Sequence, residues 1–293
     1  MTDTTRSAPT ERYLIVGAGG MLGHDLQAAL SGRAVTALTR AELDVTDLEQ
    51  VRAAVPGHTV IINASAYTKV DDAESNEEAA HAVNATGAAN LARAAAENGA
   101  RLVQVSTDYV FDGEATEPYA EDAPHAPVSA YGRTKAAGET AALEANPGRT
   151  YVVRTAWLYG AHGPNFVKTM IRLAGSHDTV KVVTDQVGQP TWTADLAQRI
   201  VDLLDSDAPG GIYHGTNSGQ TSWFEFTQAI YTLAGLDPAR VHPTTAAEFV
   251  RPAPRPAYSV LGHAAWHAAG LKPMRHWHDA LTEASRQGVL EQE

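Results

Sequence analysis

Three side chains between Ser106 and Lys135 have the types and spacing needed to reduce a carbonyl group. Tyr131 and Lys135 are four residues apart, so on a helix they share one face. Thr107 lies upstream, at the end of an apolar run that is typical of a strand. A tyrosine can donate the proton, a lysine one turn away stabilises its phenolate, and a hydroxyl can bind the carbonyl oxygen. The pattern predicts proton transfer from Tyr131 coupled to hydride transfer from a nicotinamide.

Regularly alternating strands and helices are predicted before and after these residues. Apolar runs alternate with Ala-rich stretches, and such continuous runs indicate a parallel sheet that is covered on both faces. We therefore expect an α/β fold with a Rossmann-type doubly wound parallel sheet. The expected strands are 12–16, 34–38, 59–63, 101–105 and 150–154, and the expected helices are 21–30, 48–54, 76–98 and 131–145.

The regular alternation ends near residue 155, and this suggests the domain organisation. Residues 11–155 are expected to form the dinucleotide-binding domain. Residues 156–293 are expected to form mainly a smaller C-terminal substrate-binding lobe, with segments near 180–205 returning to the Rossmann sheet. Residues 1–10 are polar and are expected to form a disordered tail.

The composition excludes several classes of function. The chain has 293 residues and a net charge of −12, which argues against nucleic acid as a partner. It has no cysteine, so disulfides and thiol chemistry are excluded. No apolar run approaches the length of a membrane span, and the N-terminus lacks a hydrophobic signal region. We expect a cytoplasmic protein that binds neither nucleic acid nor membrane.

A glycine pattern directly after the first expected strand predicts a nucleotide site. Gly17 permits the tight turn, Gly20 lets the backbone approach a pyrophosphate, and Gly23 allows close packing of helix and strand. Met21 and Leu22 begin the helix, whose free N–H groups favour phosphate.

Further residues at strand ends are expected to contact the dinucleotide. Arg40 follows the second strand, where an acidic residue would hold the ribose of NAD, so NADPH is favoured and NADH remains possible. Asp44 and Val45 suit the adenine edge. Small residues after the third strand leave room for the cofactor. The remaining expected contacts are Ala64, Ser65, Ala66, Val105, Tyr131 and Lys135, of which Lys135 can bond the nicotinamide ribose.

The glycine pattern and the Tyr131–Lys135 pair resemble the extended short-chain dehydrogenase/reductase superfamily. Within it, four stretches are similar to the dTDP-4-dehydrorhamnose reductase family: AYTKVD at 66–71, STDYVFDG at 106–113, RTAWLYG at 154–160 and DQVGQPT at 185–191. The resemblance covers nearly the whole chain from residue 12. It implies reduction of the 4-keto group of dTDP-6-deoxy-L-lyxo-4-hexulose to dTDP-L-rhamnose, or of a close analogue, with NADPH or NADH.

The resemblance also implies which residues contact the sugar nucleotide. By position, Thr107 and Asp108 would contact the sugar, Val70 would line the pocket and Trp157 would pack on the sugar face. Asn165 and Phe166 would close over the nucleotide. Two arginines in a Pro-rich stretch are further candidates, because a guanidinium can bond two diphosphate oxygens at once; they are Arg251 and Arg255.

Some members of this family form a dimer that is bridged by a metal through glutamates. Here the corresponding positions look like Asp25 and Ala194, so we expect no metal ion and a monomer or weak homodimer. Two alternatives stay open: another reductase, epimerase or dehydratase of the extended superfamily, and a non-catalytic NADP-binding regulatory subunit. Asp108-Tyr109 after Thr107, where a dehydratase would have an acidic pair, lowers the dehydratase option.

Overall fold

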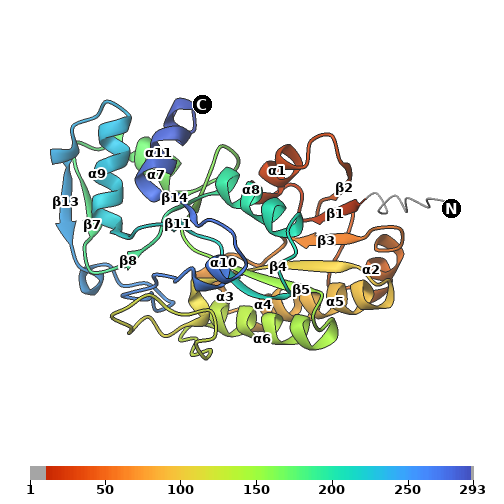
Figure 1. Ribbon diagram of the computed structural model, residues 1–293. Helices are drawn as coiled ribbons and strands as arrows, with labels where there is room; N and C mark the ends of the chain where they lie inside the picture. Colours follow the sequence, from red (N-terminus) through yellow and green to blue (C-terminus); the bar gives the residue numbers. More distant parts are fainter. Residues whose placement is uncertain (1–10, 292–293) are drawn as a thin grey trace, which may run out of the picture.

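Six parallel strands form a central sheet in the computed structural model, which describes residues 11–291 (Figure 1). All neighbouring strands in it are parallel, and their side chains are mostly buried. This confirms the expected Rossmann-type sheet. The predicted tail, residues 1–10, lies outside the described residues. Across the sheet the strands are β2 (Ala34–Leu38), β1 (Arg12–Val16), β3 (Val60–Asn63), β4 (Arg101–Thr107), β5 (Thr150–Thr155) and β10 (Gly211–His214).

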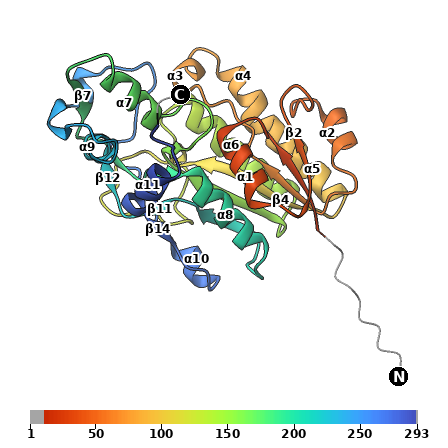
Figure 2. The ribbon, with the colours of Figure 1, turned by 90° about the horizontal axis from the view of Figure 1, so that it is seen from above.

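Helices cover both faces of the sheet, as Figure 2 shows from above. The helices α1 (Met21–Ala29) and α8 (Thr193–Leu204) lie on one face, and α2 (Leu48–Ala54), α5 (Gly87–Glu97) and α6 (Ala130–Ala145) lie on the other. Side chains of a strand alternate between its two faces. Accordingly Tyr13 and Ile15 pack in one core, whereas Leu14 and Val16 pack in the other.

The long helix predicted over 76–98 is interrupted in the structure. It consists of α4 (Glu77–His81), a π-helical turn η1 (Ala82–Thr86) and α5. The interruption lies where α6 packs most closely, because a Cβ on Gly138 would come within 2.1 Å of the Asn84 carbonyl oxygen. The buried Asn84 also donates to the Thr134 hydroxyl and accepts from the Tyr67 amide. The widened turn accommodates these contacts.

The second half of the chain has a hydrophobic core of its own. Its main elements are α7 (Phe166–Ala174), β7 (Val180–Val183), α9 (Trp223–Leu233), β13 (Val241–Thr244) and α11 (Trp277–Arg286). Short elements complete the lobe and its connections: α3 (Val70–Ala73), β6 (Leu158–Tyr159), β8 (Val187–Gly188), β9 (Thr191–Trp192), β11 (Asn217–Ser218), β12 (Thr221–Ser222), α10 (Ala264–Ala268) and β14 (Met274–His276).

The prediction that residues 180–205 return to the central sheet is wrong for the strand within them. β7 pairs with β13 in the second lobe. The α8 helix does return, since it packs beside α1, and the strand that then joins the sheet is β10, paired with β5. A parallel strand must be reached through a crossover, and α8 supplies that crossover. Within residues 11–291, no helix has the length and apolar character to cross a membrane.

Candidate active site

The order of the strands reverses between β1 and β3, and the glycine turn lies at this point. Gly17 has a φ of +85°, and a Cβ there would lie 2.7 Å from the Ser65 nitrogen. The backbone after β1 therefore touches the backbone after β3, where only glycine fits. In open α/β sheets such a reversal is where ligands bind.

The start of α1 is shaped for an anion. Gly20 makes no side-chain cap, so the first N–H groups of α1 lack the partner that a Ser or Asp would supply. A Cβ on Gly23 would lie 2.4 Å from the Gly17 carbonyl oxygen, so the helix can approach the turn only with glycine there. Leu22 faces the core, whereas Met21 is partly exposed. These residues fit a dinucleotide pyrophosphate.

The turn after β2 differs in one respect from the sequence expectation. Arg40 is exposed there, as expected for a residue that pairs with a 2′-phosphate. An acidic side chain is nevertheless present, because Glu42 accepts hydrogen bonds of 2.8 Å from both the amide and the hydroxyl of Thr39. Asp44 accepts bonds from Thr46, and Val45 is buried in the core.

The end of β4 and the beginning of α6 bring the three catalytic candidates together. Ser129 caps α6 by accepting from the Gly132 amide at 3.1 Å, which places Tyr131 in the first turn and Lys135 in the second. A Cβ on Gly132 would lie 2.1 Å from the Tyr109 carbonyl oxygen, so α6 starts in direct contact with the segment after β4. Thr107, the last residue of β4, forms a side-chain hydrogen bond with Tyr131.

The pKa values at this site differ from what the sequence suggested. Loss of solvation raises the pKa of Tyr131, and the hydrogen bond with Thr107 offsets this only in part. The expected lowering by Lys135 is not found, because the lysine donates instead to the Val105 carbonyl at 2.6 Å. Burial lowers the pKa of Lys135 to about 8. Tyr131 is thus held in its protonated form, the form that can donate.

Asp108 is a buried carboxylate directly after Thr107. One of its oxygens accepts from the Thr107 hydroxyl at 2.9 Å, and Ser259 also bonds the carboxylate, whereas the other oxygen, Oδ2, has no hydrogen-bond partner among residues 11–291. Burial raises the pKa of Asp108 to about 6. A buried oxygen without a partner is costly, so this atom is suited to accept from a ligand hydroxyl.

A cavity of about 460 Å³ lies between this site and the second lobe. Five of the residues that the sequence suggested for the substrate line it: Asp108, Trp157, Phe166, Arg251 and Arg255. Val70 and Thr107 do not line it, although Asp71 and Asp108 beside them do. Asn165 is also outside the lining. It caps α7, donates to the Gly160 carbonyl at 2.9 Å and lies 3.9 Å from the Met21 sulfur, on the nucleotide side.

Trp157 is held in one orientation by its neighbours. It has a φ of +48°, which side-chain-bearing residues rarely adopt. One face of its indole stacks on Trp223, with ring centroids 3.5 Å apart and planes 9° apart. Gly188 leaves it space, since a Cβ there would lie 2.5 Å from the indole. The two tryptophans together form an aromatic wall of the cavity.

Arg251 and Arg255 both face one acidic residue. A guanidinium nitrogen of Arg255 lies 3.0 Å from the Asp71 carboxylate, and one of Arg251 lies 4.0 Å from it. All three line the cavity. Both guanidinium groups therefore lie at the cavity beside the Asp71 carboxylate.

Several cavity residues were not predicted from the sequence as site residues. Asp71 belongs to the AYTKVD stretch, so its position in that motif could have identified it as a site residue. Tyr109, whose ring lies edge-on to Tyr131 at 5.5 Å, follows Thr107 in STDYVFDG and could also have been found. Trp223 carries no such signal, because α9 comes to the cavity only through the packing of the second lobe.

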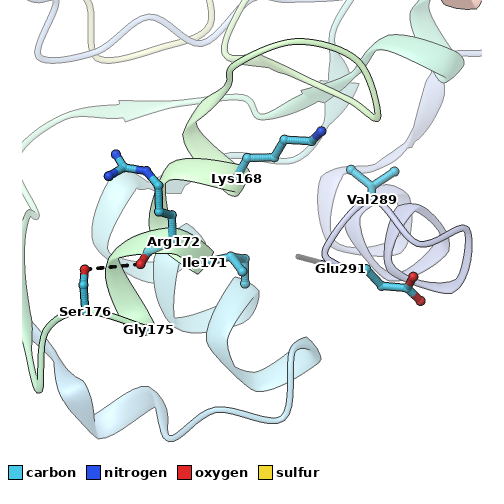
Figure 3. A pocket seen from close by; sticks show the side chains of 7 residues that line it. All are labelled: Lys168, Ile171, Arg172, Gly175, Ser176, Val289 and Glu291. Carbon is cyan, nitrogen blue, oxygen red and sulfur yellow. Dashed lines mark hydrogen bonds between the residues drawn. The ribbon is translucent and has the colours of Figure 1, made fainter. Parts of the chain in front are cut away.

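A second cavity of about 440 Å³ lies beside α7 near the C-terminus (Figure 3). Lys168 and Arg172 extend from α7, and Val289 and Glu291 lie opposite them. None of the catalytic candidates lines this cavity. No group of three or more acidic or histidine side chains suited to a metal occurs among residues 11–291.

The fold and the site define an NAD(P)H-dependent oxidoreductase of the Rossmann type. A glycine turn and the start of a helix lie at the sheet reversal, Thr107 is hydrogen-bonded to Tyr131 at the end of β4, and Asp108, next to Thr107, lines the cavity. This is the arrangement in which a side chain donates a proton to a carbonyl while a nicotinamide supplies a hydride.

Comparisons with known proteins identify the family. The model of the RmlD substrate binding domain matches residues 11–289, and the chain belongs to this family. A dTDP-4-dehydrorhamnose reductase of Streptomyces griseus is 54% identical, covering 94% of this chain and 93% of that protein. A dTDP-4-keto-6-deoxy-D-glucose reductase of Streptomyces niveus is 50% identical, covering 94% and 96%. These findings confirm the resemblance seen in the sequence.

A solved structure extends the comparison to the cofactor. The dTDP-4-dehydrorhamnose reductase of Bacillus anthracis, solved in complex with NADP, superposes with a TM-score of 0.92 at 40% identity, covering 95% of this chain and 99% of that one.

Proposed function

We propose that this protein uses NADPH to reduce the 4-keto group of a dTDP-linked 4-keto-6-deoxyhexose. The substrate that fits the family is dTDP-6-deoxy-L-lyxo-4-hexulose, and its product is dTDP-L-rhamnose or a close deoxysugar analogue. One observation carries the proposal: Thr107 and Tyr131 are hydrogen-bonded at the carboxyl end of β4, beside a cavity that Asp108 lines. The names of the relatives supply the sugar.

The nucleotide site is assigned to the residues around the sheet reversal. Backbone groups of Gly17, Gly20, Met21 and Leu22 would hold the pyrophosphate at the start of α1, with Gly23 allowing the approach. Arg40 would pair with the 2′-phosphate of NADPH. Further contacts are assigned to Asp44, Val45, Ala64, Ser65, Ala66 and Val105.

The chain's own side chains would carry the proton. NADPH, when bound, supplies a hydride to the carbonyl carbon. Tyr131, protonated because its pKa is raised, would donate to the developing alkoxide, and Thr107 would orient the same oxygen. Lys135, one turn along α6 from Tyr131, would hold the nicotinamide ribose.

The cavity would bind the sugar nucleotide. Asp108 would accept from a sugar hydroxyl through its unpartnered oxygen. Trp157 and Phe166 would pack on the apolar surface of the deoxysugar and the nucleotide, as Asn165 closes the cofactor side. Arg251 and Arg255 would bond the diphosphate, and Val70 would support Asp71 from the same short helix.

The test is turnover of the purified protein with two substrates. NADPH would be mixed with dTDP-6-deoxy-L-lyxo-4-hexulose, and with dTDP-4-keto-6-deoxy-D-glucose because a relative at 50% identity is named for that sugar. Absorbance of NADPH reports turnover, and NMR of the product reports the configuration at C4. Consumption with the first substrate supports the proposal. Tight NADPH binding without consumption of either sugar would favour the regulatory alternative instead.

We further propose a cellular setting and an assembly for the protein. We place the protein in the cytoplasm, where nucleotide sugars are its expected partners, and we expect a monomer or weak homodimer with no bound metal. Sedimentation of the purified protein with and without EDTA tests the assembly.

A further inference from the structure

Consecutive residues of β4 hold one face of α6 at three successive turns. The lysine of the catalytic pair donates a hydrogen bond to β4, and the tyrosine of the pair is hydrogen-bonded to the last residue of this strand. The carboxylate of a third residue, four positions beyond the lysine, accepts a hydrogen bond from a side chain of the same strand. The three contacts are Val105 with Lys135, Ser106 with Glu139, and Thr107 with Tyr131. The catalytic pair therefore belongs to a row of three helix residues, of which Glu139 is the innermost.

Glu139 is a fully buried carboxylate with several donors around it. It accepts from the hydroxyl of Ser106, from the His125 ring at 2.8 Å and from the Arg154 guanidinium at 2.8–3.1 Å. Although burial acts to raise the pKa of Glu139, the bonds from His125 and Arg154 lower it to about 2. Glu139 therefore carries its charge throughout the working pH range.

Arg154 is itself fixed in place, which makes the cluster rigid. It lies on β5, next to β4 in the sheet, and is almost completely buried. It donates to the Glu121 carbonyl at 3.1 Å, and its guanidinium lies 5.0 Å from the centre of the Phe111 ring. Holding α6 to two strands requires both partners, because a lone buried carboxylate would be strongly destabilising.

The charge of Glu139 also reaches Lys135. Burial lowers the pKa of Lys135, and the negative charge of Glu139 raises it in opposition. Tyr131 lies one turn before the lysine on the same helix, and the charged or titratable groups that face Glu139 and its partner are Arg154 on β5 and two histidines. Of these histidines, His125 pairs with Glu139, and His214 on β10 has its pKa lowered to about 3 by burial and Arg154, so it is neutral.

We propose that Glu139 is a positioning residue of the proposed reductase: its buried carboxylate, paired with Arg154, fixes α6 on β4 one turn beyond Lys135. The inference rests on the proposed function for its kinetic part. Arg154 is the countercharge that keeps Glu139 ionised. Neither residue contacts the cavity, so both act through Tyr131 and Lys135.

The test compares Glu139→Gln with Glu144→Gln, an exposed glutamate of the same helix. Removing the charge at 139 should lower the pKa of Lys135 by about one pH unit. The decline of kcat at alkaline pH should therefore move to lower pH, with kcat at its optimum falling about tenfold or more. The Glu144→Gln variant should match the parent protein in both respects. Glu139→Asp, which keeps the charge, should restore the position of the alkaline decline.

A readout that needs no substrate separates this proposal from the proposed function. The ε-carbon resonance of Lys135, assigned by its loss in Lys135→Arg, can be titrated in the protein alone. A lower pKa of Lys135 in Glu139→Gln than in the parent protein supports the proposal even if no sugar is turned over. An unmoved lysine titration in the folded variant would overturn it.

If Glu139→Gln does not fold, Ser106→Ala and His125→Leu each remove one bond from the carboxylate and leave its charge. Both should reduce kcat by several-fold while the alkaline decline stays in place. Unchanged kcat in both variants would overturn the positioning role.

Discussion

Thr107 and Tyr131 share a hydrogen bond where the last residue of β4 meets the first turn of α6. This bond lowers the pKa of Tyr131 against the effect of burial. Replacing Thr107 by Val keeps the shape and removes the hydroxyl, so we expect kcat to fall by about 10- to 100-fold. Thr107→Ser, which keeps the hydroxyl, should stay within about threefold of the parent protein. Steady-state kinetics measure kcat of each variant. Equal activity of the Val and Ser variants would show that the hydroxyl has no role in the reaction.

Asp108 should make substrate binding depend on pH. Its pKa is raised to about 6 by burial, so the group is protonated below that pH and charged above it. The charged form accepts from a sugar hydroxyl, and KM should therefore rise as the pH falls through 6. In Asp108→Asn this dependence should disappear and KM should be high at every pH. A KM profile of the variant that still follows the parent protein would show that another group titrates.

The same group gives a stability prediction with a fixed sign. Because the folded pKa of Asp108 lies above its unfolded value of about 4, the folded state binds the proton more tightly between these two pH values. This contribution is present below about pH 4 and is lost as the pH rises through 6. We therefore expect the free energy of unfolding, measured with urea, to fall more between pH 4.5 and pH 7 in the parent protein than in Asp108→Asn. An equal change in both proteins would contradict this.

Two glycines allow the nucleotide site to be tested with a matched control. Gly17 and Gly32 have nearly the same positive φ, +85° and +82°, but only Gly17 lacks space for a Cβ. Both Ala variants should lose about 1–2 kcal/mol of stability from the backbone conformation. Only Gly17→Ala should also weaken NADPH binding, by about tenfold or more. Fluorescence titration with NADPH measures this, and similar affinities of both variants would place the pyrophosphate elsewhere.

Trp223 should contribute to sugar-nucleotide binding although it lies outside the recognised motifs. It stacks on Trp157 and lines the cavity. In Trp223→Leu we expect the Kd for dTDP to rise about three- to tenfold, while the Kd for NADPH stays unchanged. Phe224→Leu, on the next residue and outside the cavity lining, is the control. Calorimetry with dTDP gives both values, and an unchanged affinity in Trp223→Leu would exclude Trp223 from the binding site.

Much of the first half of the fold could be predicted because its signals are local. The run 12–16 and the helix 48–54 were placed with the same bounds that the structure has, since apolar runs and helix signals there are uninterrupted. The π-turn at 82–86 was missed because it comes from Gly138 packing on Asn84, more than fifty residues away in the sequence. The strand β10 was missed because it is short and lies in the less regular half.

The candidate site shows the same division between local and distant information. The motif residues Thr107, Tyr131 and Lys135 were predicted from spacing, and the structure brings them together. The effect of Lys135 on Tyr131 was not predicted correctly, because the direction of the lysine depends on the Val105 carbonyl of another strand. Glu139 lies on the predicted face of α6, but nothing local shows that Arg154 of β5 meets it inside the protein.

The decisive role in the proposed reaction is that of Tyr131 as the proton donor to the carbonyl oxygen. It is tested most directly by single-turnover kinetics of Tyr131→Phe with NADPH and dTDP-6-deoxy-L-lyxo-4-hexulose, with NADPH affinity measured alongside. We expect the rate to fall by about 10²- to 10⁴-fold while the Kd for NADPH changes by less than about threefold. A rate that stays within a few-fold of the parent protein would contradict it.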